Sequence, residues 1–109
     1  MKKDIKAYLY DVDNSISNVL AFIGHKSFDE YNKDLMVKAA VERQFEIIGE
    51  ILRRMSLDFP EIYAKIRNAR RIIDFRNVIS HGYDLVDDQM VYDIAKNQLL
   101  DLRADIKKL

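Results

Sequence analysis

Apolar side chains recur at steps of three and four residues through the first part of the chain, and this spacing restricts the fold more than any other feature. In residues 4–23 the stripe consists of Ile5, Tyr8, Leu9, Val12, Ile16, Val19, Leu20 and Ile23. One apolar stripe with a period near 3.6 residues is the pattern of an amphipathic α-helix. No alternating strand pattern occurs, and one proline and three glycines in 109 residues leave little material for anything but helices and short turns. The sequence therefore predicts an all-α protein.

The first helix is expected to end at residues 24–26, where a glycine interrupts the stripe. Ser27 followed by Glu30 has the spacing of a capping box, so a new helix starts near this point, although Asn32 could serve as the cap instead. The second long helix is expected over residues 33–55. Its broad apolar face indicates either a central helix or one that buries a second side in an oligomer.

Pro60 is tolerated at a first helical position and cannot continue the preceding helix, so residues 58–60 separate two helices. The remaining helices are expected at residues 61–66, at residues 69–81, and from Asp87 or Asp88 to about Lys107. A chain of this length can bury a real core as one domain. We therefore predict an antiparallel up-and-down bundle of four to five helices that forms a single domain over residues 1–109.

Cysteine is absent, which excludes disulfides and thiolate metal sites. The two histidines, His25 and His81, lie far apart and belong to no motif with metal-ligand spacing, so neither a metal nor a cofactor is predicted. The first residues lack the apolar run of a signal peptide, and no segment approaches membrane-spanning length. We expect a cytoplasmic protein that does not contact a membrane.

The charges balance overall, with 18 basic and 18 acidic residues, and this gives no support for nucleic-acid binding. Their distribution gives some support, because residues 53–76 hold seven basic side chains against three acidic ones. Four aspartates follow directly in residues 84–93. The basic segment is either a binding surface or the solvated face of amphipathic helices.

Five side chains that could bind a ligand lie within eight residues, namely Arg76, Asn77, Ser80, His81 and Tyr83. At about 100° per residue, the first four of these fall within about 140° of one side of a helix. The other side carries the apolar residues Ile72, Phe75, Val78 and Ile79. Glycine is the usual residue where a chain leaves a helix, so residue 82 is expected to end this one and to leave the tyrosine at the rim. Such a polar face suits an anionic, phosphate-bearing ligand.

Three residues of the second long helix complement this face. Gly49 costs about 1 kcal/mol relative to alanine in a helix interior, and close approach to another helix would explain its presence. Glu46 and Glu50 could pair with arginines on a facing helix or across a dimer, or could be plain surface charge.

The spacing Arg-x4-His-x-Tyr formed by Arg76, His81 and Tyr83 resembles that of the HEPN superfamily, a group of small all-α domains that includes many ribonucleases. The neighbouring Asn77 and Gly82, together with residues 46–50, are similar to the HepT-like toxin branch. The resemblance extends from the helix that contains Tyr8 to the C-terminus. It implies an RNA substrate for this chain.

The residue types suit RNA cleavage without a metal. Histidine gives and takes protons near neutral pH, so His81 could act on the ribose 2′-hydroxyl or on the leaving oxygen. The planar fork of Arg76 could hold two phosphate oxygens and stabilise charge as it develops. Asn77 could orient the imidazole or bind a phosphate oxygen, while Ser80 and Tyr83 could contact phosphate or ribose. The need for a 2′-hydroxyl would spare DNA.

The reaction needs both an acid and a base, and the motif of one chain contains a single histidine. The family resemblance implies a homodimer, in which two motifs face one shared cleft. It further implies a minimal nucleotidyltransferase antitoxin as partner, which silences the toxin by adenylylating Tyr83. A bulky anionic group there would occupy the space of an RNA phosphate and engage Arg76.

Two other readings use the same residues. In the first, the chain is a non-catalytic helical adaptor that binds a nucleotidyltransferase or a nucleotide through the polar face. In the second, the motif only satisfies hydrogen bonds between helices. The adaptor and the nuclease separate on His81, whose replacement by alanine should abolish cleavage and leave partner binding intact.

Overall fold

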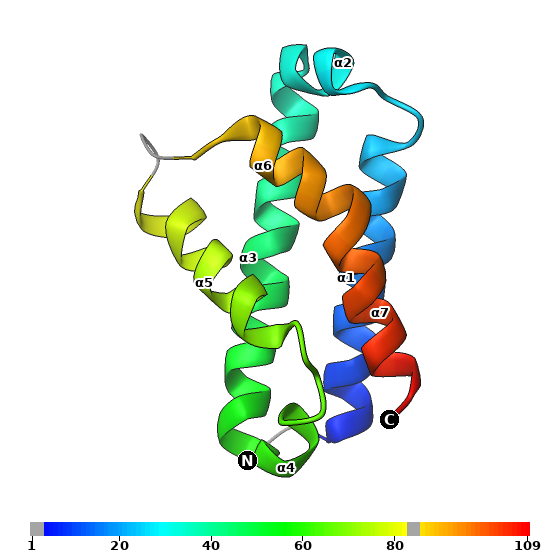
Figure 1. The fold of residues 1–109 in the computed structure, drawn as a ribbon, viewed down its shortest axis with the longest axis vertical. Coiled ribbons are helices and arrows are strands. Elements are labelled where there is room, and N and C mark those ends of the chain that lie inside the picture. The colour runs from blue at the N-terminus through cyan, green and yellow to red at the C-terminus, as the bar shows by residue number, and fades with distance from the viewer. Residues whose placement is uncertain (1–3, 83–85) are drawn as a thin grey trace.

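The computed structural model describes residues 4–82 and 86–109, and within these ranges it contains helices and turns but no strand (Figure 1). In chain order the elements are α1 (Ile5–Ile23), α2 (Phe28–Lys33), α3 (Leu35–Asp58), α4 (Pro60–Tyr63), α5 (Ala69–His81), α6 (Asp88–Asp93), η2 (Ile94–Gln98) and α7 (Leu99–Lys107). The last three follow one another without interruption and form one C-terminal helix. This arrangement confirms the predicted all-α bundle. No helix of the described ranges is long and apolar enough to cross a membrane.

The centre of the bundle is α3, which packs against α1 on one side and α5 on another (Figure 1). Its 24 residues span about 36 Å at 1.5 Å per residue, close to the 40 Å length of the molecule. The C-terminal helix lies against α1. The broad apolar face predicted for residues 33–55 is therefore explained by the central position of α3, which has neighbours on more than one side.

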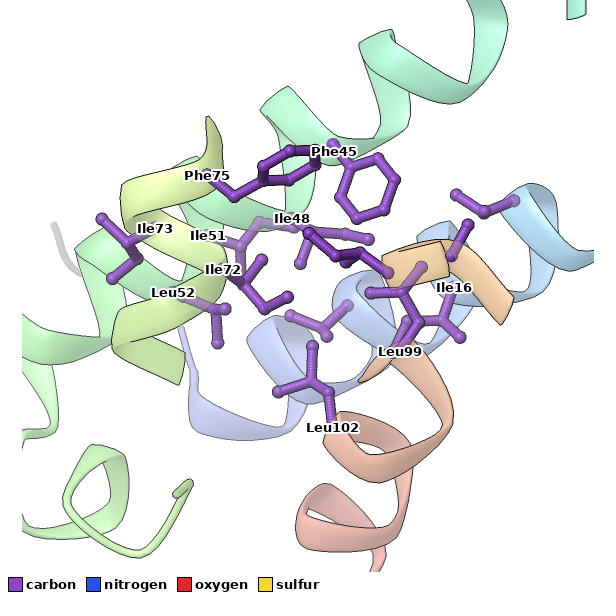
Figure 2. Packing of buried hydrophobic residues seen from close by; sticks show 14 of the residues in the cluster. Ile16, Phe45, Ile48, Ile51, Leu52, Ile72, Ile73, Phe75, Leu99 and Leu102 are labelled. Carbon is purple, nitrogen blue, oxygen red and sulfur yellow. The ribbon is translucent and has the colours of Figure 1, made fainter. Parts of the chain in front are cut away.

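Aliphatic and aromatic side chains from α1, α3, α5 and the C-terminal helix form one core (Figure 2). Fully buried members include Val12, Ile16, Val19, Phe45, Ile48, Leu52, Ile72, Leu99 and Leu102. Burying an aliphatic or aromatic side chain of this size contributes about 1.5–3 kcal/mol. The rings of Phe45 and Phe75 meet edge to face at 5.2 Å between centroids, and this contact helps to fix how α5 sits on α3 (Figure 2).

The turn between α1 and α3 is held by two consecutive caps. Ser27 and Glu30 form the predicted capping box, in which each side chain accepts a backbone N–H of the other residue. This box starts the separate helix α2. The alternative cap, Asn32, is wrong, because α3 begins after Asp34, whose carboxylate accepts the N–H of Val37 at 3.1 Å.

Pro60 opens α4 as expected, but this helix ends at Tyr63 and is shorter than the predicted 61–66. Of the two candidate caps for the last helix, Asp87 is the one used, since its carboxylate accepts the N–H groups of Gln89 and Met90. In residues 94–98 this helix changes to π-type hydrogen bonds. The sequence did not predict that change, because no glycine or proline marks the place.

Candidate functional site

The polar motif is carried by α5, which covers residues 69–81 as predicted and ends where the N–H of Gly82 donates to the carbonyl of Val78 at 2.8 Å. Most of the expected apolar side of the helix is buried against α3, with Ile72, Phe75 and Ile79 in the core. Val78 was expected to be buried with them, but its side chain is 42% exposed. It lies at the edge of the apolar stripe and lines a cavity between α5 and the C-terminal helix.

Arg76 is the motif residue that packs most closely against α3. A Cβ atom built at Gly49 would lie 2.5 Å from both Cβ and Cγ of Arg76, so only glycine leaves room for this side chain. The close approach predicted for Gly49 is confirmed, and the group that comes near is the stem of the arginine. As a result the Arg76 side chain is only 24% exposed.

The guanidinium group of Arg76 is held at both ends. One terminal nitrogen donates to the Glu50 carboxylate at 3.4 Å, and the other donates to the Asn77 side-chain oxygen at 3.0 Å. Its Nε is buried and has no hydrogen-bond partner among the described residues. A guanidinium has five N–H bonds. Two of them donate to Glu50 and Asn77 and the Nε–H is buried, so two N–H bonds on the terminal nitrogens remain for a ligand.

Glu50 also accepts hydrogen bonds from two arginines of its own helix. Arg53 donates to both carboxylate oxygens, at 3.1 and 3.3 Å, and Arg54 donates through its Nε at 3.1 Å. The hydrogen bond from Arg53, followed by that from Arg54, lowers the pKa of the Glu50 carboxyl below its usual range. One carboxylate therefore serves three guanidinium groups, and these four side chains keep a surplus of two positive charges.

The prediction for the two glutamates thus holds for one of them. Glu50 pairs with an arginine of the facing helix α5, whereas Glu46 pairs with Arg43 of α3 itself, at 3.3 Å. An open cavity of about 290 Å³ lies over this part of α3, between α1 and α5. It is lined by Tyr8, Arg43, Glu46, Ile47, Glu50, Ile51, Arg54 and Arg76.

Ser80 and His81 are exposed in the last turn of α5. Neither side chain makes a hydrogen bond within the described residues, and His81 is not among the residues that line the cavity beside Arg76. The five-residue separation places the imidazole about 140° around the helix from the guanidinium. The structure therefore brings Arg76 and Asn77 into contact, whereas His81 makes no hydrogen bond to either of them within the described residues. Tyr83 lies outside the described residues.

A second cavity of about 570 Å³, which sequence reasoning missed, lies between the other edge of α5 and the C-terminal helix. Its apolar lining includes Val78 and Met90, and three aspartates and one arginine also line it. Three carboxylates against one guanidinium make this cavity unfavourable for phosphate. The described ranges contain no group of three or more His, Cys, Asp or Glu side chains arranged to hold a metal ion.

A helical bundle with Arg76 and His81 on a helix packed against its central helix resembles a HEPN-type domain. The family described as "Ribonuclease HepT-like" matches residues 12–109, and the chain belongs to this family.

Relatives of similar length support this assignment. "Putative RNase MJ1380" of Methanocaldococcus jannaschii is 29% identical over 97% of this chain and 96% of its own length. "Putative RNase MJ0127" of the same organism is 30% identical over 99% of this chain and 86% of its own length. "Probable ribonuclease HepT" of Thermococcus cleftensis is 28% identical over the whole chain and 98% of its own length. No solved structure matches the chain significantly.

Proposed function

We propose that this chain is the toxin of a toxin–antitoxin pair and that it cleaves RNA without a metal ion. The observation that carries the proposal is the state of Arg76, whose guanidinium is held in place beside an open cavity with two N–H bonds left for a ligand. Three arginines against two glutamates line this cavity, and the surplus of one positive charge favours an anion there. Family membership and the names of the relatives point to RNA as that anion.

In the proposed reaction the ribose 2′-oxygen attacks the adjacent phosphorus, so that a new O–P bond forms and the bond to the 5′-oxygen breaks. The 2′-hydroxyl loses a proton and the leaving 5′-oxygen gains one, which leaves a 2′,3′-cyclic phosphate and a 5′-hydroxyl end. His81 is the proposed proton donor or acceptor, because its imidazole is exposed and histidine is the side chain most often used for such proton transfers. Arg76 stabilises the charge that develops on the phosphate oxygens.

The active unit in this proposal is a homodimer with one shared cleft. Within one chain His81 stands apart from Arg76, and a second copy would supply a second imidazole to the same RNA strand. Val78 and Met90 support this arrangement, because these apolar residues are 42% and 51% exposed and line the same open cavity between α5 and the C-terminal helix. A partner copy that covered them would remove apolar surface from water.

The proposed antitoxin is a minimal nucleotidyltransferase that adenylylates Tyr83. This residue follows Gly82, the residue at which α5 ends, and is separated by one position from His81. An added adenylyl group carries a phosphate that competes with RNA for Arg76. Transfer of label from ATP to the wild-type chain, and not to Tyr83→Phe, is the expected result with such an enzyme.

The second candidate function is a non-catalytic adaptor, and the separation of His81 from Arg76 within one chain favours it. Cleavage of a single-stranded RNA in the presence of a chelator separates the two functions. A nuclease should lose at least about a hundredfold in rate in His81→Ala, the scale of general acid–base catalysis, and retain its rate in His25→Ala. An adaptor would show no cleavage that depends on His81 and would keep its partner binding in His81→Ala.

A further inference from the structure

We infer that Glu50 is a positioning residue for Arg76, which the family motif on α5 does not include. The carboxylate sets where the guanidinium lies beside the cavity, and Arg53 and Arg54 hold the carboxylate in turn. This inference rests on the proposed function, because it assigns a role to Glu50 in the same reaction. It follows from three features of the contact between α3 and α5.

The first feature is that the stem of Arg76 is already fixed and only its tip is free to vary. Gly49 forms the slot for Cβ and Cγ, and Nε is buried. The tip then depends on its two partners, Glu50 at 3.4 Å and Asn77 at 3.0 Å. Asn77 is exposed and belongs to α5 itself, so Glu50 is the partner that ties the tip to the central helix α3.

The second feature is that Glu50 does not neutralise Arg76. Its carboxylate is shared with Arg53 and Arg54, whose contacts of 3.1 Å are shorter than the 3.4 Å contact to Arg76. Arg76 keeps its orientation and also remains able to attract an anion, because the four charges sum to plus two.

The third feature is that Glu50 stays ionised where the reaction would run. The arginines lower the pKa of its carboxyl, so its charge does not change at neutral pH. The pH dependence of cleavage should therefore come from proton transfer by His81 and should have the same shape with and without Glu50. This separates a positioning group from a proton-transfer group.

The test compares Glu50→Ala and Glu50→Gln with wild type for RNA cleavage by the full chain. Loss of the anchor lets the guanidinium move by about 1 Å, a displacement that can cost up to about a hundredfold in rate. We expect kcat to fall at least tenfold in Glu50→Ala with little change in KM, because the lost interaction matters most in the transition state. Glu50→Gln keeps an acceptor oxygen of the same shape and should recover part of kcat, with an unchanged pH profile.

Asp74→Ala is the matched control. It removes a carboxylate that pairs at 3.1 Å with Arg70 of the same helix, and it does not contact Arg76. We expect unchanged kcat in this variant. A rise in activity or a lower KM in Glu50→Ala would overturn the inference, because the carboxylate would then be a competitor of the substrate. Equal losses in Asp74→Ala and Glu50→Ala would also overturn it, because the effect would not be specific to Arg76.

A second measurement decides the inference even if the wild-type chain cleaves no RNA. Side-chain NMR of Arg76 reports how ordered its terminal Nη–H groups are, whatever the activity. We expect separate Nη–H signals from a fixed guanidinium in wild type and Asp74→Ala, and averaged signals in Glu50→Ala. An ordered Arg76 in all three proteins would overturn the positioning role. Absence of cleavage by wild type would overturn only the proposed function.

Discussion

The side chain of Arg76 lies directly over the backbone of Gly49, where an added Cβ would come within 2.5 Å of its Cβ and Cγ. This contact couples the packing of α5 on α3 to the position of the one motif cation. A single glycine therefore serves both the core and the candidate site. Glycine destabilises α3 by about 1 kcal/mol relative to alanine, and in return it leaves room for the Arg76 side chain between the two helices.

Replacement of Gly49 by alanine should weaken both properties. Alanine gains about 1 kcal/mol in helix propensity, but overpacking costs about 1–3 kcal/mol because Cβ of Arg76 cannot move without moving α5. We expect the free energy of unfolding in urea to fall by up to about 2 kcal/mol and RNA cleavage to fall at least tenfold. A variant more stable than wild type with full activity would show that Arg76 needs no slot.

Phe75 should be one of the costliest residues of α5 to truncate. Its ring is buried, meets that of Phe45 at 5.2 Å, and lies next to Arg76 in the sequence. Phenylalanine to alanine changes in cores cost about 3–5 kcal/mol, a large part of the roughly 5–15 kcal/mol that stabilises a typical domain. Urea denaturation of Phe75→Ala should show this loss. A loss below about 1 kcal/mol would mean that α5 contributes little to the core.

Glu42 should lower stability at neutral pH. Burial, followed by the nearby charge of Asp88, raises the pKa of its carboxyl, while Lys38 acts in the opposite direction. A raised native pKa means that the folded state binds the proton more readily than the unfolded state, so stability falls as pH rises through these two pKa values. We expect Glu42→Gln to have a higher melting temperature than wild type at pH 7. The difference should vanish as pH falls below the unfolded-state pKa, near pH 4. A difference that is constant from pH 4 to pH 8 would contradict this assignment.

The proposed homodimer depends on the exposed apolar side chains beside the motif. Val78→Asp places a charge at this surface and should shift the chain toward the monomer in analytical ultracentrifugation, with loss of cleavage and an unchanged helical spectrum. Leu57→Asp is the control, because Leu57 is 68% exposed at the far end of α3. Equal dissociation in both variants, or in neither, would place the interface elsewhere.

The sequence predicted the parts of the fold that local chemistry determines. The bounds of α5, the capping box at Ser27 and the role of Pro60 follow from residues that act within one turn of the helix. The sequence did not predict features that depend on which other segment of the chain packs against a helix. Val78 belongs to the apolar stripe of α5, but the spacing of that stripe does not show that its edge faces an open cavity. The candidate caps, Ser27 and Asn32, did not include Asp34, which caps α3, because only the path of the turn decides where that helix starts.

The sequence named the residues of the candidate site, which stay a prediction, but it indicated only part of their arrangement. The motif placed Arg76 and His81 on one polar side, and a helical wheel cannot show that one of them turns inward over Gly49 while the other faces solvent. The pairing of Glu50 with Arg76 was one of several possibilities, because it depends on the register between α3 and α5. That register is set by core contacts such as Phe45 with Phe75.

The most direct test of the central proposal is mass spectrometry of the products formed from a defined RNA oligonucleotide by the purified chain in the presence of a chelator. The proposed reaction predicts fragments with 2′,3′-cyclic phosphate and 5′-hydroxyl ends. It also predicts that a single 2′-deoxy substitution blocks cleavage at that position and that the Arg76→Ala, His81→Ala double variant forms no such fragments. The same fragments formed at the same rate by the double variant, or none formed by the wild-type chain, would contradict it.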